Sequence, residues 1–141
     1  VTDGDIGGAV GELAAISASA KARTKAGLIR GTATSVSETV TATGNGTGYQ
    51  LGAVAADESV YAVLIVASPS GTSPTIDVLL ESDDNAGFTS PTTRATFTQA
   101  TTWADECVSV AGAITDDYWR MSWTVGGTSP SFSLTAIIGI K

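Results

Sequence analysis

Histidine is absent from this 141-residue sequence, and cysteine occurs only once. Without histidine the chain cannot form a Ser-His-Asp triad, a Cys-His pair or a histidine-based zinc site, which excludes most hydrolase mechanisms. The single cysteine, Cys107, rules out an intrachain disulfide, and its flanking "ECVSV" predicts a strand position where a small hydrophobic side chain packs, with a reactive thiol as the alternative. We therefore expect no enzyme activity, no cofactor, and no catalytic, cofactor-binding or metal-binding residues.

Charged residues are also scarce, at 15% of the chain, and acids outnumber cations by 14 to 7. The net charge of −7 leaves no basic surface for phosphates, so no specific nucleic-acid binding is expected. No apolar run approaches the roughly 18 residues that span a bilayer, so no contact with a membrane is expected either. Residues 1–30 hold four cations and three acids, and the remainder holds three cations and eleven acids. A slightly basic N-terminal part could thus dock on an acidic neighbouring copy.

Thr, Ser, Gly and Ala dominate what is present, and 43% of the residues are hydrophobic. This composition is typical of strands joined by turns, and the length suits one core. We predict an all-β chain: an antiparallel β-sandwich, jelly-roll-like, in residues 32–141, preceded by an extended N-terminal arm in residues 1–31. In the arm, Ala14, Ile16 and Ala18 follow a period of two, although the alanine content leaves a helix as the alternative.

Alternation of apolar and polar residues locates the strands of the body. The clearest alternation spans residues 118–125, and residues 75–82 and 131–140 follow the same pattern. Residues 60–67 are apolar without interruption, which predicts a central strand covered on both faces. The residues predicted to face the core are Ile76, Val78, Leu80, Ala95, Phe97, Trp119, Met121, Trp123, Val125, Phe132, Leu134, Ala136, Ile138 and Ile140.

The tetrapeptide "GTSP" occurs twice, at residues 71–74 and 127–130, each time after an apolar run. Glycine permits unusual φ angles, proline blocks further strand pairing, and the hydroxyl side chains can bond to turn backbone. We predict two equivalent turns between strands, at the same end of the body. A paired binding surface made from the two loops is the alternative.

Four acidic pairs, at residues 57–58, 83–84, 105–106 and 116–117, are the one constellation with possible chemistry. Adjacent residues of a strand point to opposite faces, so one pair cannot supply the facing carboxyls of a glycosidase. Convergence of two different pairs is the alternative. Asp83, Asp84 and Asn85 offer oxygen ligands for calcium, but their spacing is not that of an EF-hand and favours a turn. Trp103 is the one tryptophan near a predicted loop, where it could contact a carbohydrate.

Three stretches, "GNGTGYQLGAV", "GTSPTIDVLLESDDNAGFTSPTTRATF" and "ITDDYWRMSWTVGGTSPSFSLTAIIGI", resemble the C-terminal part of virion proteins of tailed bacteriophages, the tail or major tail tube proteins. The stretch "GAVGELAAISASAKARTKAGLIRGT" resembles the segment that precedes this part. The resemblance implies a tail tube subunit, or its C-terminal domain, that assembles in the host cytoplasm into a ring or tube of the phage particle with other virion proteins.

The resembling motifs belong to the scaffold, so the resemblance carries no active residue. A capsid decoration or head protein is the alternative that it leaves open. A carbohydrate-binding β-sandwich module is a further alternative, which would use loop aromatics and calcium.

Overall fold

The computed structural model describes residues 30–141, and this part of the chain is all β, without a helix. The predicted arm lies outside the described residues except for Arg30 and Gly31, which form the start of the first strand. The strands are β1 (Arg30–Val40), β2 (Gly44–Asn45), β3 (Tyr49–Gln50), β4 (Ser59–Asp83), β5 (Thr92–Thr96), β6 (Ala104–Ala111) and β7 (Tyr118–Ile140). They form one sheet in which every pairing of strands is antiparallel.

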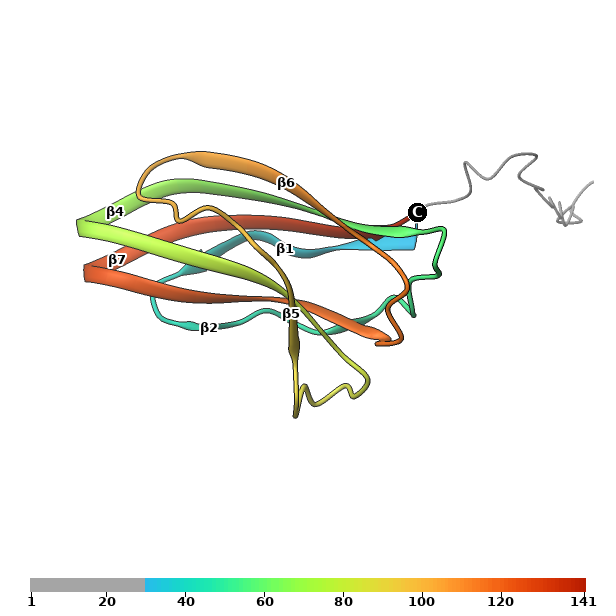
Figure 1. Cartoon of the computed structure of the whole chain (residues 1–141). Helices are drawn as coiled ribbons and strands as arrows, with labels where there is room; N and C mark the ends of the chain where they lie inside the picture. The colour runs from blue at the N-terminus through green and yellow to red at the C-terminus, as the bar shows by residue number, and fades with distance from the viewer. Residues whose placement is uncertain (1–29) are drawn as a thin grey trace, which may run out of the picture.

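The long strands β4 and β7 organise this sheet, because they pair along their whole lengths, from Val60 opposite Ile140 to Asp83 opposite Tyr118. Both strands reverse direction near their middle, at the left of Figure 1, and the sheet curls into a half-barrel. On one side of this reversal, β6 and β1 flank the first half of β4 and the second half of β7. On the other side, β5, β2 and β3 flank the remaining halves. We call these two parts the first and second halves of the sheet.

The core lies inside the curl, between the two halves of the sheet. Alternating residues of β4 and β7 point into it, because successive side chains of a strand face opposite ways. Trp119 is completely buried, and the other predicted core residues of β7 are buried too, except for Val125, which is half-buried. The buried hydrophobic residues include Val40, Val60, Ala62, Leu64, Val66, Ile76, Val78, Leu80, Phe97, Trp119, Met121, Trp123, Phe132, Leu134, Ala136, Ile138 and Ile140. The alternation read from the sequence is thereby confirmed.

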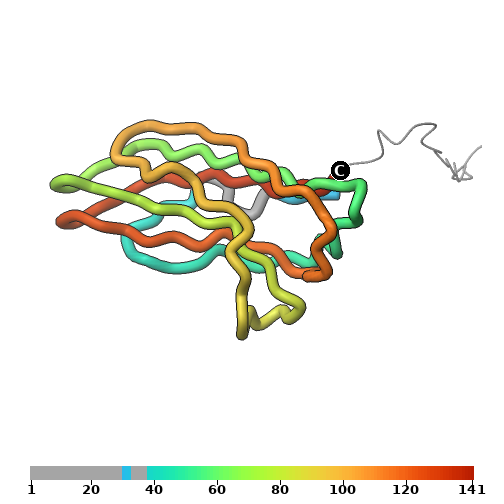
Figure 2. The backbone as a smooth tube through the Cα atoms, viewed as in Figure 1, coloured from blue at the N-terminus to red at the C-terminus, as the bar shows by residue number. Residues whose placement is uncertain are grey.

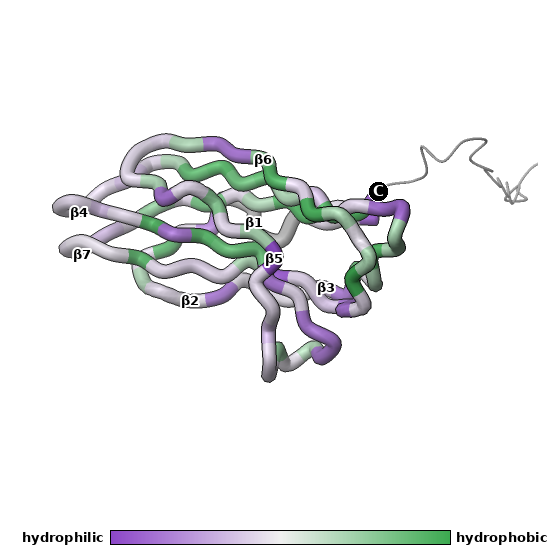
Figure 3. Tube along the Cα trace, in the orientation of Figure 1, coloured by the Kyte–Doolittle hydropathy of each residue, from purple (hydrophilic) through white to green (hydrophobic). Residues whose placement is uncertain are grey.

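The first half of β4 corrects one prediction. Residues 60–67 were expected to be covered on both faces, but Tyr61 is 44% exposed and Ile65 is 42% exposed. The curl of the sheet brings other strands over its inner face only, so within residues 30–141 the outer face has no cover. Figure 3 colours much of this half of β4 as hydrophobic.

Cys107 corrects a second prediction, because its side chain is exposed. It lies in β6, where Val108 and Val110 pack against the core. The period of two then turns Cys107 to the opposite face. The strand was predicted correctly, but the direction in which this small side chain points was wrong.

The two GTSP copies lie side by side at the same end of the sheet, where Thr72 is opposite Thr128 (Figure 2). Gly71 and Gly127 have φ angles of 109° and 102°, which favour glycine. A Cβ added to Gly71 would lie 2.6 Å from the carbonyl oxygen of Ser129, and one added to Gly127 would lie 2.6 Å from the carbonyl oxygen of Ser73. Each copy thus packs against the other in the same way, and the two equivalent turns lie at the same end as predicted. They do not join separate strands into hairpins, because β4 and β7 each run through the turn and the two strands pair with one another.

Candidate functional site

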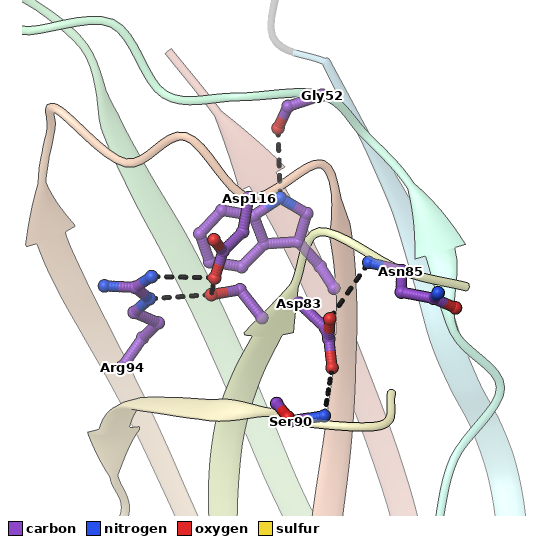
Figure 4. A network of polar contacts seen from close by, with 8 residues as sticks. Gly52, Asp83, Asn85, Ser90, Arg94 and Asp116 are labelled. Atoms are coloured by element: carbon purple, nitrogen blue, oxygen red, sulfur yellow. Dashed lines mark hydrogen bonds and ion pairs between the residues drawn. The ribbon is translucent and has the colours of Figure 1, made fainter. Parts of the chain in front are cut away.

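The acidic turn after β4 is built around the buried carboxylate of Asp83. This carboxylate accepts hydrogen bonds of 2.9 Å from the backbone N–H groups of Asn85 and Ser90 (Figure 4). The Ser90 N–H contributes most to holding the pKa of Asp83 below its ordinary value. The pKa of neighbouring Asp84 is raised, chiefly through its hydrogen bond with Asp83 and the repulsion between the two groups. The Asp83 carboxylate therefore fixes a turn by hydrogen bonds to backbone, which is the structure that the sequence favoured over a calcium site.

Beside this turn, three polar side chains form a closed triangle against the core. The hydroxyl of Ser82 donates to Asp116 Oδ2 at 2.7 Å and accepts from Arg94 Nε at 2.6 Å, while Arg94 Nη2 donates to the same Asp116 oxygen at 2.7 Å (Figure 4). The hydroxyl of Ser82, and then the guanidinium of Arg94, lower the pKa of Asp116. With its ion pair and hydroxyl partner in place, Asp116 is suited to hold β5 against the loop before β7.

A second ion pair covers the outer side of the same region. Arg120 Nε donates to Glu81 Oε2 at 2.9 Å, and the guanidinium stands 4.2 Å from the centroid of the Phe88 ring. This stacking over an aromatic face is a favourable geometry for arginine. Arg120 and Glu81 are opposite one another on β7 and β4, so the pair connects the two central strands to the turn that carries Phe88.

The remaining acidic pairs also have structural partners. Glu58 accepts hydrogen bonds of 2.9 Å from Arg30 and from the backbone N–H of Ala55, and Glu106 accepts one of 2.8 Å from the backbone N–H of Thr98. The pairs at 83–84 and 116–117 lie close together, since Ser82, which precedes Asp83, donates a hydrogen bond to Asp116. Among residues 30–141, no three or more acidic, cysteine or histidine side chains are grouped so that they could hold a metal ion.

A depression of about 450 Å³ lies on the outer face of the second half of the sheet, where Asp77, Leu79 and Glu81 line it. The carboxylates of Asp77 and Glu81 already have partners in the protein. Asp77 accepts hydrogen bonds from Gln99, and Glu81 accepts one from Arg120. Trp103 is 67% exposed but is not among the residues that line this depression. The exposed Trp103 therefore lies apart from the depression, whose own lining includes the buried Trp123.

The strongest candidate for a functional surface is the outer face of the first half of the sheet. Tyr61, Ile65 and Ile137 are each between 42% and 47% exposed there. Their strands are neighbours, and Val63 lies between Ile137 on β7 and Cys107 on β6. We call the five side chains of these residues the outer apolar patch. A contiguous apolar surface of this kind is typical of protein interaction sites, and the sequence signal for it was the unbroken apolar run of residues 60–67.

Within the described part of the chain there is no helix with the length and apolar character to cross a membrane. Comparison of the sequence with protein-family models and with curated proteins, and of the structure with solved structures, finds no match.

Proposed function

We propose that this protein is a structural virion protein of a tailed bacteriophage, and that it acts by self-assembly without enzymatic activity. In this proposal it is a tail tube subunit, or the C-terminal domain of one, and it assembles into a ring or tube in the host cytoplasm. Its partners are further copies of itself and other virion proteins. It uses no cofactor, and it binds neither a specific nucleic acid nor a membrane.

The observation that carries this proposal is the outer apolar patch on a domain whose polar side chains serve its own fold. Among the side chains of residues 30–32 and 38–141, every buried nitrogen or oxygen atom has a hydrogen-bond partner. The carboxylates of Asp83 and Asp116 are bound by backbone amides, a hydroxyl and a guanidinium, which leaves no poised acid or base at either position. A rigid domain with an uncovered apolar face is suited to polymerisation.

The curled sheet supports a finer description of the fold. We infer that the two halves of the sheet act as the two layers of an antiparallel β-sandwich, jelly-roll-like, with the core residues of β4 and β7 between them. The reversal at the GTSP turns connects the layers. In the assembly, residues 1–29 serve as an extended arm that reaches a neighbouring subunit, where backbone pairing or packing against the sheet supplies the affinity.

A capsid decoration or head protein would use the same rigid domain and is the second candidate. The two differ in where the copies sit: decoration proteins occupy symmetry positions of a shell, whereas tube proteins stack as rings. The exposed Trp103 keeps a carbohydrate-binding module as a third candidate. In that case the chain should bind to a glycan array, and Trp103→Ala or a chelator should abolish the binding.

Electron microscopy of particles that contain this chain tests the proposal, with gold-labelled antibody raised against residues 30–141. We expect the gold along the tail, at regular spacing. Gold spread over the head would favour the decoration protein, and gold on neither structure would overturn the proposal of a virion protein.

A further inference from the structure

We propose that the outer apolar patch is the docking site for residues 1–29 of a neighbouring copy of this chain. This inference rests on the proposed self-assembly and identifies the surface through which copies are joined. The patch consists of Tyr61, Val63 and Ile65 on β4, Ile137 on β7 and Cys107 on β6.

The first half of β4 is apolar on both of its faces. Residues 60–66 alternate between the core side and the outer side, yet the outer positions 61, 63 and 65 are as apolar as the inner ones. An antiparallel strand with one face in water normally carries polar residues on that face. Tyr61 and Ile65 instead expose over two fifths of their surface, which fits a face that another segment covers.

Residues 1–29 join the domain at Arg30, at the end of the sheet that is opposite the GTSP turns. Arg30, the first described residue, is held by hydrogen bonds to the carbonyl oxygens of Leu51 and Ala53 and by its ion pair with Glu58. From Arg30, β1 runs antiparallel to β7 towards the GTSP end, so the chain enters at the opposite end of the sheet. To cover the patch of its own domain, the segment would have to reverse direction just before Arg30.

The length and composition of residues 1–29 also suit binding to the patch. Its 29 residues could reach at most roughly 100 Å if fully extended, enough to cross the face of a neighbouring domain. It offers apolar side chains such as Leu13 and Ile16. Its three cations, Lys21, Arg23 and Lys25, follow its three acids in the sequence, so its C-terminal part is basic although residues 1–29 carry no net charge. The outer positions of β4, β6 and β7 around the patch contain no cation, and exposed Asp105 stands opposite Ile65. The patch thus offers apolar contact to the segment and one carboxylate, that of Asp105, to its cations.

Cys107, the only cysteine of the chain, is a natural probe of this site. Thiol labelling is measured on the 141-residue chain, assembled and then dissociated by dilution. We expect Cys107 to react slower by at least about tenfold in the assembly, because a covered thiol is shielded from the reagent. Equal labelling rates in an otherwise intact assembly would overturn the inference while leaving self-assembly in place.

Cross-linking identifies the occupant. One set of copies keeps Cys107, and isotope-labelled copies carry Cys107→Ser together with Ala14→Cys, Ala18→Cys or Ala22→Cys. After mixing and reassembly with a short bismaleimide, we expect at least one variant to cross-link to Cys107 of an unlabelled copy. In a control, each chain carries both Cys107 and the introduced cysteine, and labelled and unlabelled copies of this chain are mixed. Cross-links found only within single chains would overturn docking on a neighbour. Cross-links between two Cys107 residues alone would identify a second copy's patch as the occupant instead.

Substitutions inside and outside the patch test its role in assembly. Ile65→Ser with Ile137→Ser should weaken assembly by at least about tenfold while the melting temperature stays near that of the wild type, because both side chains are half-exposed. Trp103→Ser removes a larger exposed apolar side chain outside the patch and should leave assembly unchanged. Equal effects of both changes, or none from the patch variant, would contradict the inference. A wild-type chain that never assembles would refute the proposed function itself.

Discussion

Replacement of either turn glycine by alanine should destabilise the domain strongly, because both glycines have positive φ and face backbone of the opposite turn. Gly71 has φ 109°, and its added Cβ would meet the carbonyl oxygens of Ser129 and Thr128 at 2.6 and 2.8 Å. Backbone strain of this kind costs about 1–3 kcal/mol. The close approach to two carbonyl groups places Gly71→Ala at the upper end, about 3 kcal/mol, which lowers the melting temperature by roughly 10 °C.

Circular dichroism, with heat and with urea as denaturants, measures this effect. Gly87→Ala is the matched control, because Gly87 lies in a turn without positive φ and its added Cβ would come no closer than 3.2 Å to the Asn85 side chain. We expect this control to change stability by less than about 1 kcal/mol. If Gly71→Ala melts within 2 °C of the wild type, the packing of the two turns described above is wrong.

The double variant Gly71→Ala with Gly127→Ala tests the reciprocity of the turns. Each substitution displaces the segment that the other one contacts, so the second change meets a turn that has already moved. The combined loss of stability should therefore be smaller than the sum of the two single losses. Strict additivity would show that the two turns act independently.

Three further predictions concern the core and the charges. Trp119→Ala should cost about 3–5 kcal/mol, since the indole is fully buried, and a variant that melts like the wild type would contradict this packing. The pKa of Asp116 is lowered, so its ionised form stabilises the fold above about pH 4, and this contribution is lost as the pH falls through the folded-state pKa. The stability gap between wild type and Asp116→Asn should thus narrow in urea titrations below pH 4, and a constant gap would oppose this account. EDTA should leave the melting temperature unchanged, whereas a drop reversed by calcium would make Asp83, Asp84 and Asn85 ligands.

The facing of the core strands could be predicted because alternation is a local property. Trp119, Met121 and Trp123 alternate with polar neighbours, so one buried face was enough to identify them. The outer face of residues 60–67 was mispredicted, because an apolar run reports the character of both faces but not which of them the rest of the domain covers. The predicted direction of the Cys107 side chain was wrong for a related reason, because a small side chain is compatible with either face of an edge strand.

The candidate site was less accessible to sequence reasoning than the fold. The triangle of Ser82, Arg94 and Asp116 joins residues up to 34 positions apart, and only the pairing of strands brings them together. The equivalence of the two GTSP turns was visible in the sequence, but their mutual contact depends on the register of β4 with β7. The outer apolar patch is likewise formed by residues of three neighbouring strands, so only its residues on β4 could be recognised in the sequence.

The most direct measurement of self-assembly compares the 141-residue chain with a version that lacks residues 1–29. This cut retains Arg30 and Gly31, which pair with Ile140 and Gly139 in the sheet. Sedimentation velocity over a range of concentrations, followed by negative-stain electron microscopy, gives the mass and shape of each species. We expect rings or tubes for the 141-residue chain and a folded monomer for the shortened one. A 141-residue chain that remains monomeric at every concentration, or a shortened chain that forms the same rings, would contradict this expectation.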